Sequence, residues 1–345
     1  MSQVTESPPA GAGRPAPQYL TARHVVAEMA DHGTRRLQTL SVLQILVLAM
    51  LAGGFVTVGA LFSVLLAVRV GSPGAQRLVE GLGFSAGFFF VILSDAVLFT
   101  EANVLLPATI LRCRGSAGAR LATIARFWAL AWAGNLAGAF LTGYAIHLAQ
   151  HYPPDVTGLL TQVIDRKMAY RAIGGAGAWW QVVLSGMLAN WLVGMAAFFS
   201  VMGRSIIGKY IPVFLAVTLF VAANFQHSPA NMGYFSLIMP TGHGPGWGAA
   251  LAWNIIPASA TWPAAPSLSP VLVRARPSPP ARPRRTRPGR DGCERHREQG
   301  PAVTGLPGHG ALPTTGTPIY PAWLDAGNDR GAAWQLSSRS HPAPA

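Results

Sequence analysis

Long apolar stretches alternate with short polar ones over the first 240 residues of the chain. The stretches at about 40–68, 127–149 and 179–202 carry no charge, and each is long enough for a bilayer core, which needs about 20 apolar residues in a helix. Two more, at about 81–111 and 211–240, have apolar flanks but polar residues near their centres. The pattern predicts five membrane spans, two of them interrupted.

The flanking segments differ from this central part. Residues 1–39 are polar and lack the compact apolar core and cleavage site of a secretory signal, so we expect a cytoplasmic tail with a short amphipathic helix. Residues 40–258 form the predicted membrane domain, with a polar loop at about 150–178. Residues 259–345 are rich in Pro and Arg, and no window there is suited to span a bilayer or to build a core, which predicts a disordered tail.

The basic tail also raises the alternative of a nucleic-acid or acidic-lipid partner. Its basic run "RARPSPPARPRRTRPGR" lacks interleaved aromatic residues and any nucleic-acid motif, which favours a disordered tail and no nucleic-acid partner.

The composition supports a helical membrane protein, since 50% of the residues are hydrophobic, 11% are charged and the mean hydropathy is +0.33. The two cysteines, Cys113 and Cys293, lie far apart and match no metal-ligand spacing. We therefore expect free thiols, no metal site and no cofactor.

Positive charge falls on the loops after the second and the fourth predicted spans, at Arg112, Arg114, Arg120, Arg126, Arg204 and Lys209. The positive-inside rule places these loops, and with them the amino terminus, in the cytoplasm. The sequence thus predicts a multi-pass protein of the plasma (inner) membrane.

The two interrupted spans occupy corresponding places in the two halves, with "SDAVLFTEANV" in one and "NFQHSPANM" in the other. Such a pair indicates an inverted repeat whose broken helices meet near the bilayer midplane. The segments "AGNLAG" and "ANWLVG" of the third and fourth spans are also alike, although small residues at this spacing occur in any closely packed bundle.

The fifth span places His227 beside a helix breaker, Pro229. A single histidine in an apolar segment is often only a hydrogen-bonded structural residue. Here, however, Asn224, Ser228 and Asn231 surround it, and broken backbone at membrane depth persists only where it is buried in protein or lines a water-filled path. The position therefore makes His227 a candidate functional residue.

The second span supplies a matching group, because the Thr100 hydroxyl is suited to bind a small oxyanion. Apolar residues around it are candidates for constrictions: Phe84, Phe88, Leu98 and Phe99. Phe84 and Phe88 also have the i, i+4 spacing of ordinary helix packing. Asp95 and Glu101 would be costly against lipid, so each is expected to face the interior, a cavity or an interface.

Six segments, taken together, carry a resemblance: "SDAVLFTEANV", "WAGNLAGAF", "GMLANWLVGMAAF", "GRSIIGKY", "FVAANFQHSPANM" and "WNIIP". Their order and spacing over about residues 30–258 resemble the formate/nitrite transporter family. The resemblance implies an all-α, aquaporin-like inverted repeat of three plus three spans, with the second and fifth broken. It also implies a homopentamer in the lipid bilayer, each protomer with its own pore.

The resemblance further implies the site. His227 and Thr100 would face the permeating anion, Asn190 would be the buried asparagine of the fourth span, and the constrictions would be Phe84, Phe88, Leu98 and Phe220. A carboxylate is costly to desolvate, whereas a monocarboxylic acid with a pKa near ~4 crosses an apolar constriction once it is neutralised. His227 would hold or relay the proton, so the expected function is proton-coupled transport of formate, nitrite or a similar anion, and not an enzymatic reaction.

Two departures from the family pattern stand out. A vestibule lysine of the family falls near Gly174 here, while Lys167 lies several residues earlier and Arg166 and Arg171 are alternative cations. After "WNIIP", where a sixth span should continue, the chain turns to "ASATWPAAPSLSPVLVRARP", as an out-of-frame reading of GC-rich coding sequence would give. The expected sixth span is then missing, and such a chain would form no competent pore.

Three alternatives remain open from the sequence. A solute channel of the aquaporin type also joins two half-helices, but would carry paired Asn-Pro-Ala motifs, which "SPANM" resembles only superficially. A membrane enzyme or haem-handling protein would need His147, His151 and His227, which lack ligand spacing within one span. A truncated transporter without function is the third.

Overall fold

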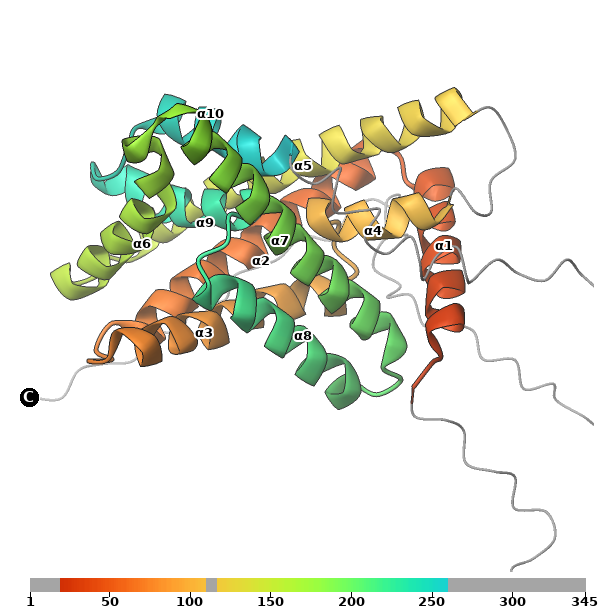
Figure 1. Ribbon diagram of the computed structural model, residues 1–345, viewed down its shortest axis with the longest axis horizontal. Coiled ribbons are helices and arrows are strands. Elements are labelled where there is room, and N and C mark those ends of the chain that lie inside the picture. Colours follow the sequence, from red (N-terminus) through yellow and green to blue (C-terminus); the bar gives the residue numbers. More distant parts are fainter. Residues whose placement is uncertain (1–18, 110–116, 260–345) are drawn as a thin grey trace, which may run out of the picture. The chain divides into compact units, whose positions relative to one another are not determined.

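The structure is a computed structural model, and it describes residues 19–109 and 117–259 (Figure 1). All regular elements in these two ranges are helices, which confirms the all-α class for the described part of the chain. Cys113, Cys293 and the predicted tail after Ser259 lie outside the described residues.

The same order of elements occurs twice along the chain. The first series is α1 Ala22–Thr39, α2 Val42–Ala67, α3 Pro73–Leu93, α4 Phe99–Thr109 and α5 Ala117–Ala149. The second is α6 Pro154–Ile173, α7 Gly175–Met202, α8 Ile206–Ala222, α9 Ser228–Ile238 with the 3-10 turn η1 Met239–Thr241, and α10 Trp247–Ser259. Among the described residues, α2, α3, α5 and α7 are long and apolar enough to cross a membrane, and α8 is a shorter apolar helix.

The two predicted interruptions are real breaks between helices, α3 to α4 and α8 to α9. Asp95 and Asn224 adopt left-handed backbone, with φ of 55° and 58°, each four residues before the next helix begins at Phe99 or Ser228. Asp and Asn tolerate this conformation better than most residues, because their short polar side chains form local hydrogen bonds. The two halves therefore build their breaks in the same way, while the inverted relation between them stays a prediction.

Two predicted boundaries need correction, and one expected helix is present. The prediction of a polar loop at 150–178 was wrong, because most of this segment is the helix α6. Its buried residues recur at helical spacing, at Val156, Leu159, Leu160, Val163, Ile164 and Lys167, but the polar and charged residues between them hid this pattern. The third span begins about ten residues before its predicted start at 127, since the Ala-rich sequence from Ala117 favours helix, and the expected amphipathic helix of the N-terminal tail is α1.

Close backbone contact joins α2 to α5 in the first half of the chain. A Cβ atom at Gly138 would overlap the main chain of Met50, and one at Gly53 would overlap that of Asn135. Because glycine has no side chain, the two backbones can touch, as they do at small residues between membrane helices. The main apolar core is formed mainly by residues of α2, α3 and α6 to α9, and it holds Phe84, Phe88, Leu98 and Phe220 together.

The short helix α10 packs against α7 and α9 and contains the "WNIIP" segment. It forms the described start of the expected sixth span. The remainder of that span, and the predicted change of reading frame after it, fall outside the described residues.

Candidate functional site

The break in each half presents one polar side chain to the other, and the two meet. The Nε2 atom of His227 lies 2.9 Å from Thr100 Oγ1, and both residues are buried. Thr100 is in the first turn of α4, and His227 is the N-cap residue of α9. The structure thus brings together two residues that are 127 positions apart in the sequence.

The N-cap role of His227 selects its tautomer. Its Nδ1 accepts a hydrogen bond from the Ala230 backbone N–H at 3.2 Å, so in the neutral ring the proton sits on Nε2. That N–H donates to Thr100 Oγ1, which leaves the threonine hydroxyl hydrogen free to point elsewhere. The pair therefore offers a hydroxyl donor that is held in place by an imidazole.

Aromatic rings pack directly against this pair. The rings of Phe220 and His227 have centroids 5.2 Å apart, and Phe84 meets Phe220 edge to face at 5.7 Å. Phe84 also stacks on Tyr234 at 5.9 Å. Phe88 and Leu98 are buried in the same core cluster, so all four predicted constriction residues gather in one part of the molecule's interior.

Asn190 lies buried on α7, but its amide nitrogen bonds Gly186 O of its own helix and not His227 or Thr100. Its amide oxygen has no hydrogen-bond partner among the described residues. The same holds for both amide atoms of Asn103, one helical turn after Thr100. Buried amides in proteins are usually satisfied, so these groups mark a polar interior that water or a ligand can complete.

Side chains that the sequence argument missed hold the breaks in shape. Asn135 donates to Ala49 O at 2.8 Å and Val97 O at 2.9 Å, and accepts from Phe99 N at 2.8 Å. In the second half, Ser185 Oγ accepts from Gln226 N at 3.0 Å. The sequence does carry a signal for Asn135, since it is an amide inside the apolar segment "AGNLAG". It was overlooked because the segment was interpreted only through the spacing of its small residues.

The two acidic residues of the second span meet a cation from α1. Arg36 Nη2 donates to Asp95 Oδ1 at 2.7 Å and to the Asp95 carbonyl at 3.1 Å, and its Nη1 lies 3.5 Å from Glu101 Oε2. Arg36 itself is buried. The Asp95 side chain remains 67% exposed and the Glu101 side chain only 14%, so both are paired while Asp95 lies at the surface of the protomer.

The cations near the second break lie on α6. Lys167 is buried and donates from Nζ to Phe225 O at 2.9 Å, although the sequence placed it too early to serve the vestibule. Arg166 pairs with Glu80 of α3, and its carbonyl accepts from Asn224 Nδ2 at 3.2 Å. The exposed Arg171 has no such contact with the break in the described part of the chain. A glycine pair with positive φ, Gly174 and Gly175, joins α6 to α7.

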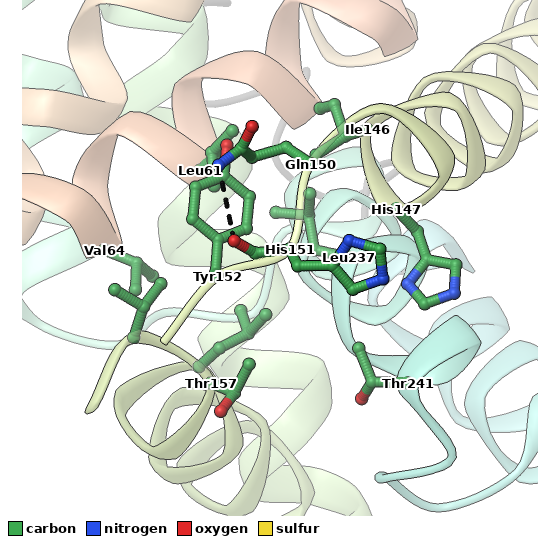
Figure 2. Close-up of a pocket in the computed structure, with 12 residues that line it drawn as sticks. Leu61, Val64, Ile146, His147, Gln150, His151, Tyr152, Thr157, Leu237 and Thr241 are labelled. Atoms are coloured by element: carbon green, nitrogen blue, oxygen red, sulfur yellow. Dashed lines mark hydrogen bonds between the residues drawn. The ribbon is translucent and has the colours of Figure 1, made fainter. Parts of the chain in front are cut away.

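A separate cavity of about 270 Å³ opens beside the ends of α2, α5 and α9 (Figure 2). Figure 2 shows His147 and His151 side by side at one end of it, with ring centroids 6.4 Å apart. His227 does not line it, so the three histidines of the haem alternative do not form one group.

The arrangement suits a small, weakly acidic guest. It joins a hydroxyl donor and a titratable ring at the point where two short helices begin, and the N-termini of such helices favour negative charge. The apolar rings beside the pair offer no hydrogen bonds that could replace the water around an ion. A group that is bound as an anion and moves on as a neutral molecule fits both features.

Known proteins of one family are similar to most of the described chain. A model of the formate/nitrite transporter family matches residues 23–260. A probable formate transporter of Methanothermobacter thermautotrophicus is 29% identical over 227 residues, which cover 62% of this chain and 81% of that protein. The formate channel FocA of Escherichia coli K12 is 31% identical over 190 residues, which cover 54% of this chain and 62% of that protein.

Solved structures agree at the level of fold. A channel described as an FNT family ion channel has a TM-score of 0.58 at 20% identity, covering 70% of this chain and 94% of its own. A pentameric formate channel with formate bound has a TM-score of 0.55 at 19% identity, covering 68% of this chain and 96% of its own.

Proposed function

The chain belongs to the formate/nitrite transporter family, a family of membrane transporters of anions, and on that premise we propose that it carries formate, nitrite or a similar small anion together with a proton. The observation that carries this proposal is the buried hydrogen bond between His227 and Thr100 beside the Phe84 and Phe220 rings.

The proposed path begins with attraction of the anion to donors at the two breaks. The free Thr100 hydroxyl hydrogen donates to the anion, and the charge of the anion favours uptake of a proton by the nearby His227. The imidazolium then gives its Nε2 proton through the Thr100 hydroxyl to the anion. The neutral acid passes the aromatic constriction, since only the charged form carries the large desolvation cost.

Proton uptake by His227 has a structural cost that makes it transient. A protonated ring has hydrogen on both nitrogens, so Nδ1 no longer accepts the Ala230 N–H that it caps in the neutral state. His227 is therefore neutral at rest and charges only while an anion is present. This couples the proton to the substrate.

We further propose a homopentamer in the plasma membrane, with the amino terminus in the cytoplasm. The pentamer rests on the likeness to a channel described as pentameric, and the orientation on the basic loop at Arg204 and Lys209.

The test uses the full 345-residue chain in proteoliposomes. The proposal departs here from the expectation that a chain without its sixth span forms no competent pore, and flux through this chain would refute that expectation. Formate and nitrite uptake are measured at external pH about 5.5 and about 7.5, with glycerol as a neutral probe and chloride as an anion that takes up no proton. We expect formate or nitrite uptake several-fold faster at the lower pH, and no chloride flux. Glycerol uptake that is independent of pH, without formate or nitrite flux, would instead support the solute-channel alternative.

A further inference from the structure

Glu80 is a buried carboxylate on α3 that the proposed transport path does not use. Only 3% of its surface is exposed, and the residues next to it in the chain, Val79 and Gly81, are apolar. Arg166 of α6 donates from Nη2 to both of its oxygens, at 2.8 Å and 2.9 Å. A buried carboxylate is stable only when it is paired in this way.

The pair lies against the break of the fifth span. Arg166 accepts at its carbonyl from Asn224 Nδ2, and the next residue, Lys167, donates from Nζ to Phe225 O. Glu80, Arg166 and Lys167 line one small cleft together with Phe220, Asn224 and Tyr234. Because Phe220 contacts the His227 ring, this cleft adjoins the proposed site.

The charges around the cleft do not cancel. Glu80 contributes one negative charge, and Arg166 and Lys167 contribute one positive charge each, so the net charge is +1. The other titratable groups that face it are uncharged at rest: Tyr234, whose hydroxyl bonds Ser63, and His227 behind Phe220. Without Glu80, two cations would stand at the cleft.

We propose that Glu80 tunes anion affinity: it cancels the charge of Arg166, so that, among the described residues that line the cleft, Lys167 is left as the one uncompensated cation. This rests on the proposed function. A conducting site must bind strongly enough to attract its ion and weakly enough to release it. Glu80 thus acts through the charge of Arg166, and it does not touch the anion.

The size of the effect follows from Coulomb's law. For an anion about 10 Å from the cleft, at an effective dielectric constant of about 20, one added charge changes affinity roughly tenfold. The dissociation constant for formate should therefore follow the net charge of the cleft and not the presence of the ion pair as such.

The test compares variants of the full chain in nanodiscs, with carbon-13 formate binding measured by NMR titration. Burial lowers the pKa of the Lys167 ammonium to about 7, so titrations are made at about pH 5.5, where it is charged. Glu80→Gln raises the net charge to +2 and should tighten formate binding roughly tenfold. The double variant Glu80→Gln/Arg166→Gln restores +1 and should bind like the wild type.

A matched control removes a carboxylate from a surface pair. Asp155→Asn breaks the pairing of Asp155 with Arg69, which is 86% exposed, and should leave binding unchanged, because solvent screens this site. A second readout is flux: Glu80→Gln should lower the half-saturation concentration and also the maximum rate, since release becomes slower.

A purely structural ion pair gives a different pattern. Glu80→Gln would then reduce pentamer yield without changing the dissociation constant, and that result would overturn the proposal, as would formate binding that none of the variants alters. If Glu80→Gln does not assemble, Glu80→Leu/Arg166→Leu keeps the +1 charge and must bind within about threefold of the wild type, or the proposal fails. A wild-type chain without acid-stimulated flux refutes the proposed function, whereas the order of dissociation constants still decides the role of Glu80.

Discussion

At the scale of single residues, the site depends on one imidazole with two different hydrogen bonds. His227 caps α9 through Nδ1 and holds Thr100 through Nε2. The capping bond needs only an acceptor, whereas proton exchange needs a titratable ring. A substitution that keeps the first and removes the second separates structure from function.

His227→Asn is that substitution. Asparagine is a good N-cap residue, so α9 should still begin at Ser228 and the protein should assemble in wild-type yield. Proton-coupled formate uptake should fall at least tenfold and lose its dependence on external pH. The measurement is proteoliposome flux at several pH values, with yield by gel filtration as the control. An unchanged pH profile would return His227 to a structural role.

A second residue-scale prediction concerns Asn135, which satisfies three main-chain groups around the first break. Asn135→Ala leaves these buried groups without partners, at a cost of about 1–3 kcal/mol for each. We expect a lower midpoint of thermal unfolding in detergent. Thr123→Ala is the control, because Thr123 is exposed and its hydroxyl bonds Ala119 O of its own helix. Equal midpoints for the two variants would contradict the assigned role of Asn135.

The sequence identified the residues with unusual chemistry but not those that support them. His227 and Thr100 were found because a helix breaker and a polar run interrupt apolar spans. Asn135, Ser185 and Glu80 were missed, since their partners are far away in the sequence or are main-chain atoms. Such pairings depend on how the helices pack against each other, and the hydropathy of the sequence does not show this packing.

At the scale of elements, glycines set how closely α2 and α5 approach. Gly138→Ala should prevent this approach, because the added Cβ overlaps the Met50 carbonyl group, and main chain cannot move aside as a flexible side chain can. Gly177→Ala on α7 is the matched control. No atom lies within 4 Å of its Cβ position, and alanine favours a helix by about 1 kcal/mol over glycine. Thermal unfolding of both variants tests this, and equal stability would disprove the close contact.

The sequence predicted the helices that are both long and apolar, and it failed to predict α6. The first span differs from α2 by only a few residues at its ends, and both breaks were placed correctly. For α6, the buried face includes Lys167 and the other face is polar, so the segment reads as polar throughout. A search for helical spacing instead of hydropathy would have found it.

At the scale of the whole molecule, the protomer leaves apolar faces uncovered. Exposed aliphatic and aromatic residues recur at helical spacing on several helices, among them Leu184, Leu188 and Trp191 on α7 and Ile211, Leu215 and Leu219 on α8. Exposed apolar surface of this extent is covered by lipid or by other copies of the chain.

The proposed pentamer gives a direct prediction for these faces. Native mass spectrometry of the full chain released from detergent should show five copies as the main species. A monomer as the main species in mild detergent would refute the pentamer. It would also support the expectation that the chain as written cannot complete its sixth span.

The two breaks differ in how their parts are distributed along the chain. Arg36 and Asn135 shape the first break from the first half, and Lys167 and Ser185 shape the second from the second half. The hydrogen bond between Thr100 and His227, in contrast, crosses between halves. A chain severed in the short connection at 150–153 would therefore keep, in each fragment, these contacts that form its bend. Neither fragment alone would contain the site, because helices of both halves pack together to form it. We therefore expect transport only when the two fragments assemble with each other.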